Sequence, residues 1–174
     1  MNNSFKIIVL FIGIALGFIP FGACTPTHNP PSDIVSNENE LSGNVVGIKD
    51  GDTIVVMHNG KGKTIRLYGI DAPEKKQDYG TKAKQFLSDL VFNKTVTVNV
   101  KDKDRYGRTI GEEYLQDGTN ANHEMVRAGL SWWYEQYAKN DENLKRLQNE
   151  ARTNKIGLWS LQNPTPPWEF RKRK

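Results

Sequence analysis

Between residues 43 and 70, three short segments rich in β-branched and aromatic residues are separated by turn dipeptides. The segments read GNVVGIK, TIVVMH and KTIRLYGI, and Asp50-Gly51 and Asn59-Gly60 stand between them. Asp-Gly and Asn-Gly favour the tight turns that connect antiparallel strands, and β-branched residues favour the strands themselves. The pattern therefore predicts three consecutive antiparallel strands, which commits the chain to a β-rich fold.

The rest of the chain adds a helix, a second hairpin and two further helices. Residues 81–92 carry apolar side chains at helical spacing behind Thr81, a candidate N-cap. The segments TVTVNV and TIGEEYL flank the charged loop KDKDRYGR and are predicted to pair as a hairpin. Helical patterns recur over residues 121–128 and 141–155. Five strands with a helix after the third predict an α+β fold, a five-stranded OB-type barrel with three α-helices, which often binds nucleic acids or sugars.

The amino end has the pattern of an export signal. Lys6 precedes an apolar run over residues 7–21, which is short for a bilayer span and has the length of a signal-peptide core. Cys24 is the only cysteine and follows directly in FGAC, a stretch that resembles a bacterial lipobox. We expect residues 1–23 to be a signal peptide and Cys24 to carry the lipid that anchors the protein to the cell envelope. The alternative is plain secretion with a free thiol.

Polar segments flank the expected domain on both sides. Residues 24–42 lack periodicity and contain prolines, which predicts a disordered tether. Residues 43–163 form the expected folded domain, and residues 164–174 form a basic tail. Thr25, rather than aspartate, follows the cysteine, and this resembles the pattern of lipoproteins sent to the outer membrane of a Gram-negative host.

The positive charge lies mainly in two regions. The formal net charge is +4, and without the four lysines and arginines of residues 171–174 the 24 basic residues fall to 20, equal to the 20 acidic ones. Residues 61–108 contain twelve lysines and arginines against six acidic residues. Such a stretch would form either a basic face that attracts a polyanion or a solvated charged surface.

Acidic residues gather at the ends of the second and third predicted strands. Arg66 alternates with apolar residues in the third strand, so it points away from the core if those residues point into it. It then lies near Asp71 and Glu74. Hairpin pairing of the two strands brings Asp52 to the same end as Asp71, so the sequence predicts one cluster of acids around an arginine.

The residue types in this cluster favour a hard cation and a phosphate group. Asp52, Asp71 and the backbone carbonyl of Ala72 are hard oxygen donors of the kind that suits Ca²⁺. The three histidines lie away from the cluster in the sequence, so zinc and a histidine base are poorly supported. Arg66 and Arg108 supply planar guanidinium groups that bind phosphate oxygens with two hydrogen bonds.

Two motifs carry a resemblance to a known family. DGDTIVV and RLYGIDAPE, nine residues apart, match the first signature of the staphylococcal nuclease family. DRYGRTIGEEY, residues 104–114, is similar to the second signature, with Glu113 at a position that is usually aliphatic. The chain thus resembles a thermonuclease of that family over about residues 43–160, exported as a lipoprotein.

The resemblance implies an activity and a set of residue roles. The activity is a calcium-dependent endonuclease that hydrolyses DNA, or RNA, and leaves 3′-phosphate ends. The implied roles are calcium ligation by Asp52, Asp71 and the Ala72 carbonyl, phosphate binding by Arg66 and Arg108, base catalysis by Glu74, and nucleotide contact by Tyr106. The segment SWWYEQY adds four aromatic residues whose contact with substrate the sequence leaves open, namely Trp132, Trp133, Tyr134 and Tyr137.

Two other functions compete with the enzyme. One is a non-catalytic OB-type module that binds nucleic acid on the cell envelope, but such relatives commonly lose acids or arginines of the site, and this chain keeps all five side chains. The other is a surface attachment protein that uses only the tether and the tail, which leaves the intact site unexplained. The expected partners are nucleic acid and, through the anchor, a membrane. We expect a monomer with no protein partner.

Overall fold

The computed structural model describes residues 39–173. The expected signal peptide, Cys24 and residues 25–38 of the expected tether lie outside the described residues. The strands of the described part are β1 (Glu40–Asp50), β2 (Thr53–His58), β3 (Lys61–Leu67), β4 (Ile70–Asp71), β5 (Thr95–Lys103), β6 (Thr109–Leu115) and β7 (Trp132–Trp133). Its helices are α1 (Gly80–Val91), α2 (Ala121–Arg127), α3 (Glu142–Thr153), the 3₁₀ helix η1 (Gly157–Ser160) and α4 (Pro167–Lys172).

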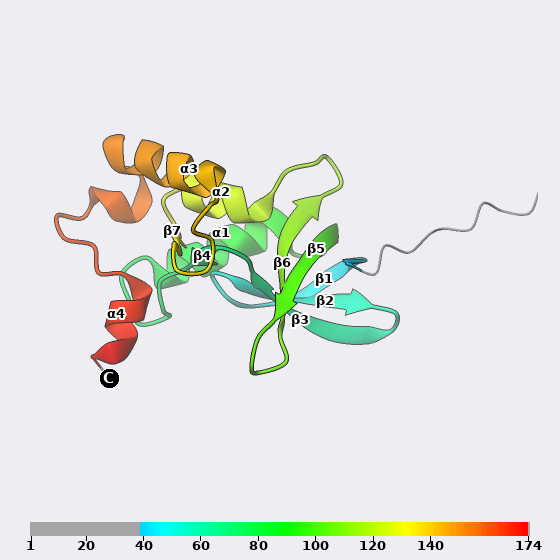
Figure 1. Ribbon diagram of the computed structural model, residues 1–174. Helices are drawn as coiled ribbons and strands as arrows, with labels where there is room; N and C mark the ends of the chain where they lie inside the picture. Colours follow the sequence, from blue (N-terminus) through cyan, green and yellow to red (C-terminus); the bar gives the residue numbers. More distant parts are fainter. Residues whose placement is uncertain (1–38, 174) are drawn as a thin grey trace, which may run out of the picture. The chain divides into compact units, whose positions relative to one another are not determined.

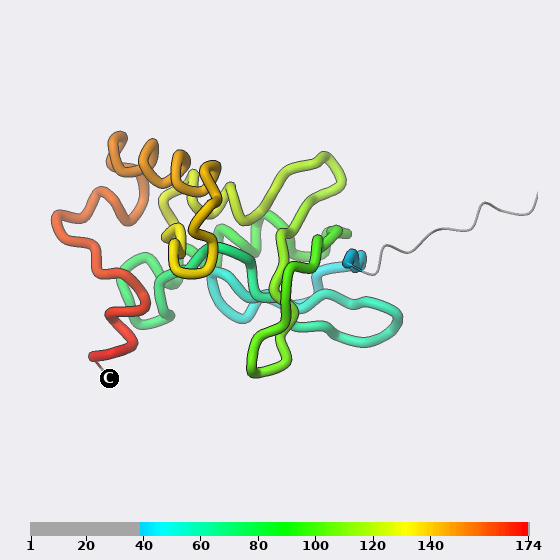
Figure 2. Tube along the Cα trace, viewed as in Figure 1, coloured from blue at the N-terminus to red at the C-terminus, as the bar shows by residue number. Residues whose placement is uncertain are grey.

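Five strands close into a barrel in the order β1-β2-β3-β6-β5, with β5 paired back onto β1 (Figures 1 and 2). Neighbouring strands are antiparallel except β3 and β6, which run parallel. Alternate side chains of each strand point inward, so Val45, Ile54, Val56, Ile65 and Val98 are fully buried. The predicted OB-type barrel with helices is confirmed.

The helices cover part of the barrel and of one another. α1 packs against β1, α2 packs against β6, and α3 lies alongside α2 (Figure 1). Leu144, Leu147 and Ala151 lie on one stripe of α3 and are buried, and the Asp141 side chain caps the helix by accepting from the backbone nitrogen of Leu144 at 3.0 Å. Among residues 39–173, no helix has the length and apolar character needed to cross a membrane.

The barrel begins earlier than expected. β1 starts at Glu40, so residues 40–42 of the expected tether belong to the first strand. They pair with β5, where Leu41 lies opposite Val98. The polar composition of residues 40–42 gave no strand pattern in the sequence. These residues form a strand because they pair with β5, more than fifty positions away in the chain.

The third predicted strand is two strands in the structure. β3 ends at Leu67, and Gly69 then takes a positive φ of 72°, a conformation that favours glycine and turns the chain out of the barrel. β4 follows and pairs with β7 in a separate two-stranded sheet, in which Asp71 lies opposite Trp132. This turn decides where Asp71 lies.

One further local expectation was wrong. The N-cap residue of α1 is Tyr79, which has a φ of 66° and makes no side-chain cap hydrogen bond, so Thr81 is not the cap. Within the segment expected as a basic tail, residues 167–172 form helix α4, which starts with Pro167 at its first position.

Glu113 departs from the usual pattern of a strand core. It lies on β6 and is fully buried, and neither oxygen of its carboxyl group has a hydrogen-bond partner among the described residues. Its backbone nitrogen donates to Oδ1 of Asn122 at 3.0 Å. Burial raises the pKa of the Glu113 carboxyl to about 8, so the group is mainly protonated at neutral pH.

Candidate active site

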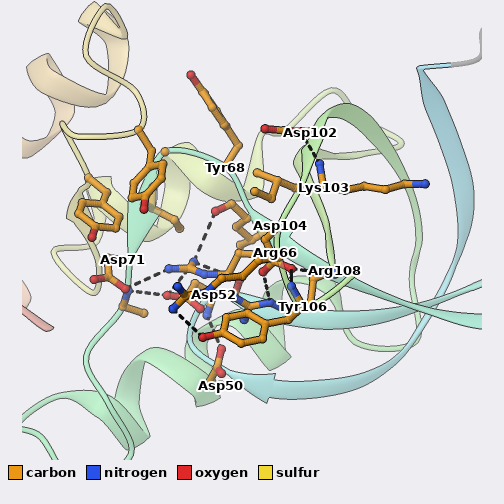
Figure 3. A pocket seen from close by; sticks show the side chains of 18 of the residues that line it. Asp50, Asp52, Arg66, Tyr68, Asp71, Asp102, Lys103, Asp104, Tyr106 and Arg108 are labelled. Atoms are coloured by element: carbon orange, nitrogen blue, oxygen red, sulfur yellow. Dashed lines mark hydrogen bonds and ion pairs between the residues drawn. The ribbon is translucent and has the colours of Figure 1, made fainter. Parts of the chain in front are cut away.

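A cleft of about 740 Å³ lies beside the barrel, where β2 begins, β3 ends and the β5–β6 loop passes (Figure 3). Helix α4 and the segment after β7 contribute residues to its wall. The cleft is lined by every described residue that the sequence predicted for the site: Asp52, Arg66, Asp71, Ala72, Glu74, Tyr106 and Arg108. Cys24, the predicted lipidation site, lies outside the described residues.

Arg66 lies between two aspartates and contacts both. Its Nη1 is 2.8 Å from Oδ2 of Asp52, and its Nη2 is 3.0 Å from Oδ1 of Asp71 (Figure 3). The β2–β3 ladder pairs Arg66 with Thr53, the residue after Asp52, so the strand register sets the first contact. Since the side chains of Arg66, Asp52 and Asp71 are only 16%, 8% and 2% exposed, solvent screens these ion pairs weakly.

Asp52 is held from several sides. Its Oδ2 accepts from the backbone nitrogen of Ala72 at 2.7 Å, and its Oδ1 accepts from the Thr53 hydroxyl at 3.1 Å. Burial raises the pKa of Asp52 to about 7, although Arg66 acts in the opposite direction. The contact with Ala72 joins the start of β2 to the end of β4, so the two stretches of the first signature meet at this carboxylate.

Glu74 lies at the rim of the cleft, and its side chain is 33% exposed. Pro73 precedes Glu74. The backbone nitrogen of Glu74 donates to Oε1 of Gln77 at 3.2 Å. Gly80 packs so closely against the Glu74 carbonyl that a Cβ atom there would clash with it. The turn that carries Glu74 is therefore fixed by its backbone contacts, while the carboxylate faces the cleft.

Arg108 comes to the cleft from the β5–β6 loop. Its Nε donates to Oδ2 of Asp104 at 2.6 Å, and its guanidinium lies 5.8 Å from the centre of the Tyr106 ring. The Tyr106 ring is 70% exposed and is also contacted by Arg105 at 4.9 Å. Arg108 and Tyr106 thus line the same cleft as Arg66, on a separate loop (Figure 3).

The aromatic segment 132–137 divides into buried and cleft-lining residues. Trp132 and Trp133 are buried, and the Trp133 ring nitrogen donates to the Ala138 carbonyl at 3.0 Å. Tyr134 and Tyr137 line the cleft, and their rings meet edge to face with centres 4.8 Å apart. Only the two tyrosines of this segment are therefore placed to meet a ligand in the cleft.

The donor set fits a hard divalent cation that takes few ligands from protein. Among residues 39–173, no group of three or more His, Cys, Asp or Glu side chains is arranged to hold a metal ion. The oxygens on offer are those of two buried carboxylates, Asp52 and Asp71, and the carbonyl of Ala72, a residue whose backbone nitrogen donates to Asp52. Both carboxylates form ion pairs with guanidinium groups, so they supply negative charge that a cation can balance.

Sequence reasoning missed two residues of this cleft. Asp104 forms an ion pair with Arg108. Its position four residues before that arginine in DRYGR is the sequence signal from which this pair could have been predicted. Arg171 on α4 contacts Asp71 with Nη2 2.8 Å from Oδ2, and its Nη1 lies 3.1 Å from Oε1 of Glu74. No local pattern marks Arg171, because it stands in a run of four basic residues typical of a solvated end.

Comparisons with known proteins identify the family of the chain. Residues 64–161 match the family described as staphylococcal nuclease homologue. An uncharacterized endonuclease of Escherichia coli O157:H7 is 54% identical over 135 residues, which cover 78% of this chain and 88% of that protein. A micrococcal nuclease of Shigella flexneri is 43% identical over 142 residues, 76% of this chain and 82% of that protein. An uncharacterized endonuclease of Haemophilus influenzae is 39% identical over 166 residues, 95% and 85% of the two chains. On this evidence the chain belongs to the staphylococcal nuclease family.

Proposed function

We propose that this protein is a calcium-dependent endonuclease that hydrolyses phosphodiester bonds of DNA, with RNA as a second candidate substrate, and leaves 3′-phosphate ends. The observation that carries the proposal is the position of Arg66 between Asp52 and Asp71, in the same cleft as Glu74 and Arg108. Nuclease relatives at 39–54% identity support the same chemistry.

The two arginines bind the scissile phosphate. Arg66 and Arg108 approach the cleft from β3 and from the β5–β6 loop, so their guanidinium groups meet a phosphate from two directions. Hydrolysis builds negative charge on the phosphoryl oxygens, and fixed cations stabilise that charge more strongly in the transition state than in the ground state. The exposed ring of Tyr106 offers a stacking surface for a neighbouring base.

Glu74 acts as the general base. It accepts a proton from water, the water oxygen bonds to phosphorus, and the bond between phosphorus and the 5′ oxygen breaks. The departing 5′ oxygen takes a proton from solvent, so the cut strand yields one fragment that ends in a 3′-phosphate and one that begins with a 5′-hydroxyl. Partial exposure of Glu74 and its place after the fixed φ of Pro73 suit a carboxylate that holds a water molecule at the rim.

The Asp52 and Asp71 carboxylates and the Ala72 carbonyl are the groups that would hold calcium. Bound there, the ion would add positive charge beside the phosphoryl oxygens. Two carboxylates and one carbonyl leave most of the usual six to eight ligand positions of calcium to water and substrate. We therefore expect weak calcium binding by the free protein and tighter binding when nucleic acid is present.

We also propose that the enzyme works at the cell envelope of a bacterium. The support is the apolar run before Cys24 and the lipobox-like FGAC, which together favour export followed by lipid anchoring. In a Gram-negative host, the lipid on Cys24 would insert into the outer membrane. The protein then acts as a monomer on nucleic acid that reaches the envelope.

The test is cleavage by the purified protein with calcium or with excess chelator. Supercoiled plasmid, a single-stranded DNA and an RNA serve as substrates, the last two with a fluorophore at the 5′ end. The new end of each labelled fragment is then its 3′ end, so its sensitivity to phosphatase identifies the 3′-phosphate. Asp71→Asn should lose cleavage, whereas Asp89→Asn, an exposed acid of α1, should retain it. Cleavage that persists unchanged in chelator contradicts calcium dependence, and binding without any cleavage indicates the non-catalytic module.

A further inference from the structure

Helix α4 places a third arginine against the carboxylates of the cleft. Arg171 Nη2 lies 2.8 Å from Oδ2 of Asp71, and its Nη1 lies 3.2 Å from Oδ1 of the same residue. The same Nη1 lies 3.1 Å from Oε1 of Glu74. One guanidinium group thus joins a proposed metal ligand to the proposed general base.

These contacts occupy part of the lone-pair positions that a metal ion would use. Oδ1 of Asp71 also accepts from Arg66 at 3.0 Å, so both oxygens of this buried carboxylate already contact a guanidinium group. The Asp71 side chain is 2% exposed, whereas that of Arg171 is 40% exposed. The carboxylate is fixed in the protein, and the arginine reaches it from the solvent side.

The segment that carries Arg171 is docked rather than extended. The Trp168 ring stacks on Tyr134 with centres 5.1 Å apart and planes at 1°, and meets the edge of Trp132 at 5.6 Å. The side-chain amide of Gln77, in the turn after Glu74, donates to the carbonyl of Thr165. These contacts fix the position of α4 relative to the cleft, so the approach of Arg171 to Asp71 is a property of the fold.

We propose that Arg171 is an internal cation that competes with the divalent metal ion for Asp71 and Glu74. The inference rests on the proposed function, because it assumes that Asp71 binds calcium. A carboxylate oxygen that accepts from a guanidinium has fewer lone-pair directions left for a metal ion, and the two cations repel each other. Calcium therefore binds more tightly when Arg171 withdraws from Asp71, and this withdrawal also frees Glu74 to hold water.

The coupling between the two cations is reciprocal. If Arg171 weakens calcium binding, then calcium weakens the contact of Arg171 with Asp71 by the same factor. Couplings of this kind typically change an affinity by about 5- to 150-fold. Substrate phosphate adds to the effect, because it gives the displaced guanidinium an alternative anion in the cleft.

Calcium affinity of the nucleic-acid-free protein tests the proposal by titration calorimetry. Arg171→Gln should bind calcium about 5- to 150-fold more tightly than the wild type. Arg173→Gln is the matched control, because it removes the same charge from the same end of the chain and should bind like the wild type. Arg171→Lys keeps a cation but loses the bidentate fork, so its affinity should fall between those of the wild type and Arg171→Gln.

An NMR measurement on the Arg171 side chain of the wild-type protein tests the proposal even if a variant disturbs the docking of α4. In the wild-type protein, the NMR signal of the Arg171 side-chain Nε–H group, assigned by its loss in Arg171→Gln, should shift when calcium is added. Equal calcium affinity in Arg171→Gln and wild type, weaker affinity in Arg171→Gln, or an unmoved signal at saturating calcium each overturn the proposal. If calcium binds and DNA is cut, only the role of Arg171 then fails. If Arg171→Gln binds no calcium and the wild type does not cleave, the proposed function fails with it.

Discussion

Asp104 binds Arg108 through both of its carboxylate oxygens. Oδ2 accepts from Nε of Arg108 at 2.6 Å, and Oδ1 accepts from its backbone nitrogen at 2.9 Å. The Arg108 side chain is 34% exposed and lies on a loop, where an arginine without a partner samples many rotamers. Asp104 therefore orients the guanidinium that we propose for phosphate binding.

Loss of Asp104 should weaken catalysis through Arg108. Asp104→Asn should lower kcat/KM for DNA about tenfold, whereas Arg108→Ala should lower it about 10²–10³-fold, because the first variant misplaces the cation and the second removes it. Asp102→Asn is the matched control, since Oδ1 of Asp102 accepts from the adjacent Lys103 backbone nitrogen and holds no arginine. A double variant that loses no more than Arg108→Ala alone would place both residues in one unit. Additive losses would contradict the positioning role.

Glu74→Gln should separate chemistry from binding. The amide keeps the size of the side chain but cannot accept the proton, so single-turnover cleavage should fall about 10²–10⁴-fold. Affinity for DNA in calcium should barely change, because repulsion between Glu74 and phosphate is also removed. Glu142→Gln, on the exposed first turn of α3, should cut at the parent rate. Parent-rate cleavage by Glu74→Gln with unaltered binding would show that Glu74 is not the base.

Glu113→Leu should stabilise the protein, and more so at alkaline pH. The folded-state pKa of about 8 lies above the ordinary value of 4.5 for a glutamate, so between these two pH values the folded protein binds up to one proton more than the unfolded chain. The free energy of unfolding of the wild type therefore falls as pH rises through this range, by at most about 1.4 kcal/mol per pH unit.

Urea unfolding of wild type and Glu113→Leu at pH 5 and pH 8 measures this effect. The stability gained by the variant should grow by about 2–4 kcal/mol between the two pH values. Glu112→Leu is the control, because the Glu112 carboxylate pairs with Lys101 at 3.1 Å outside the core and should show no such gain. Parallel pH profiles for wild type and Glu113→Leu would mean that Glu113 is not neutral in the folded protein.

Cys24→Ala should release the protein from the membrane fraction. Cys24 follows the apolar run directly and is the only thiol in the chain, so its loss removes the attachment point for lipid. Fractionation of expressing cells, with a mass measurement that confirms processing, gives the readout. Thr25→Ala, one residue further on, serves as the control and should stay anchored. Membrane retention of processed Cys24→Ala equal to that of the parent would exclude the lipid anchor.

Local sequence patterns were sufficient to predict the barrel strands and the position of Arg66 beside Asp52. The turn dipeptides and β-branched runs predict β1 to β3, because strand propensity and hairpin turns depend on neighbouring residues. The period of two in β3 then turns Arg66 away from the core, and hairpin register brings Asp52 to it. These steps need no knowledge of distant residues, which is why the meeting of Arg66 with Asp52 could be expected from the amino-acid order.

The placement of Asp71 and Arg171 depended on contacts between segments far apart in the chain. Gly69 turns the chain out of the barrel, and Asp71 is then held opposite Trp132 by β7, a strand too short to show a pattern of its own. Arg171 reaches Asp71 across one hundred positions because Trp168 docks on an aromatic surface that exists only after folding. A run of basic residues has the same local sequence pattern whether water solvates an arginine within it or a buried carboxylate pairs with that arginine. Only the packed tertiary structure, by bringing α4 onto the cleft, decided which of the two applies to this arginine.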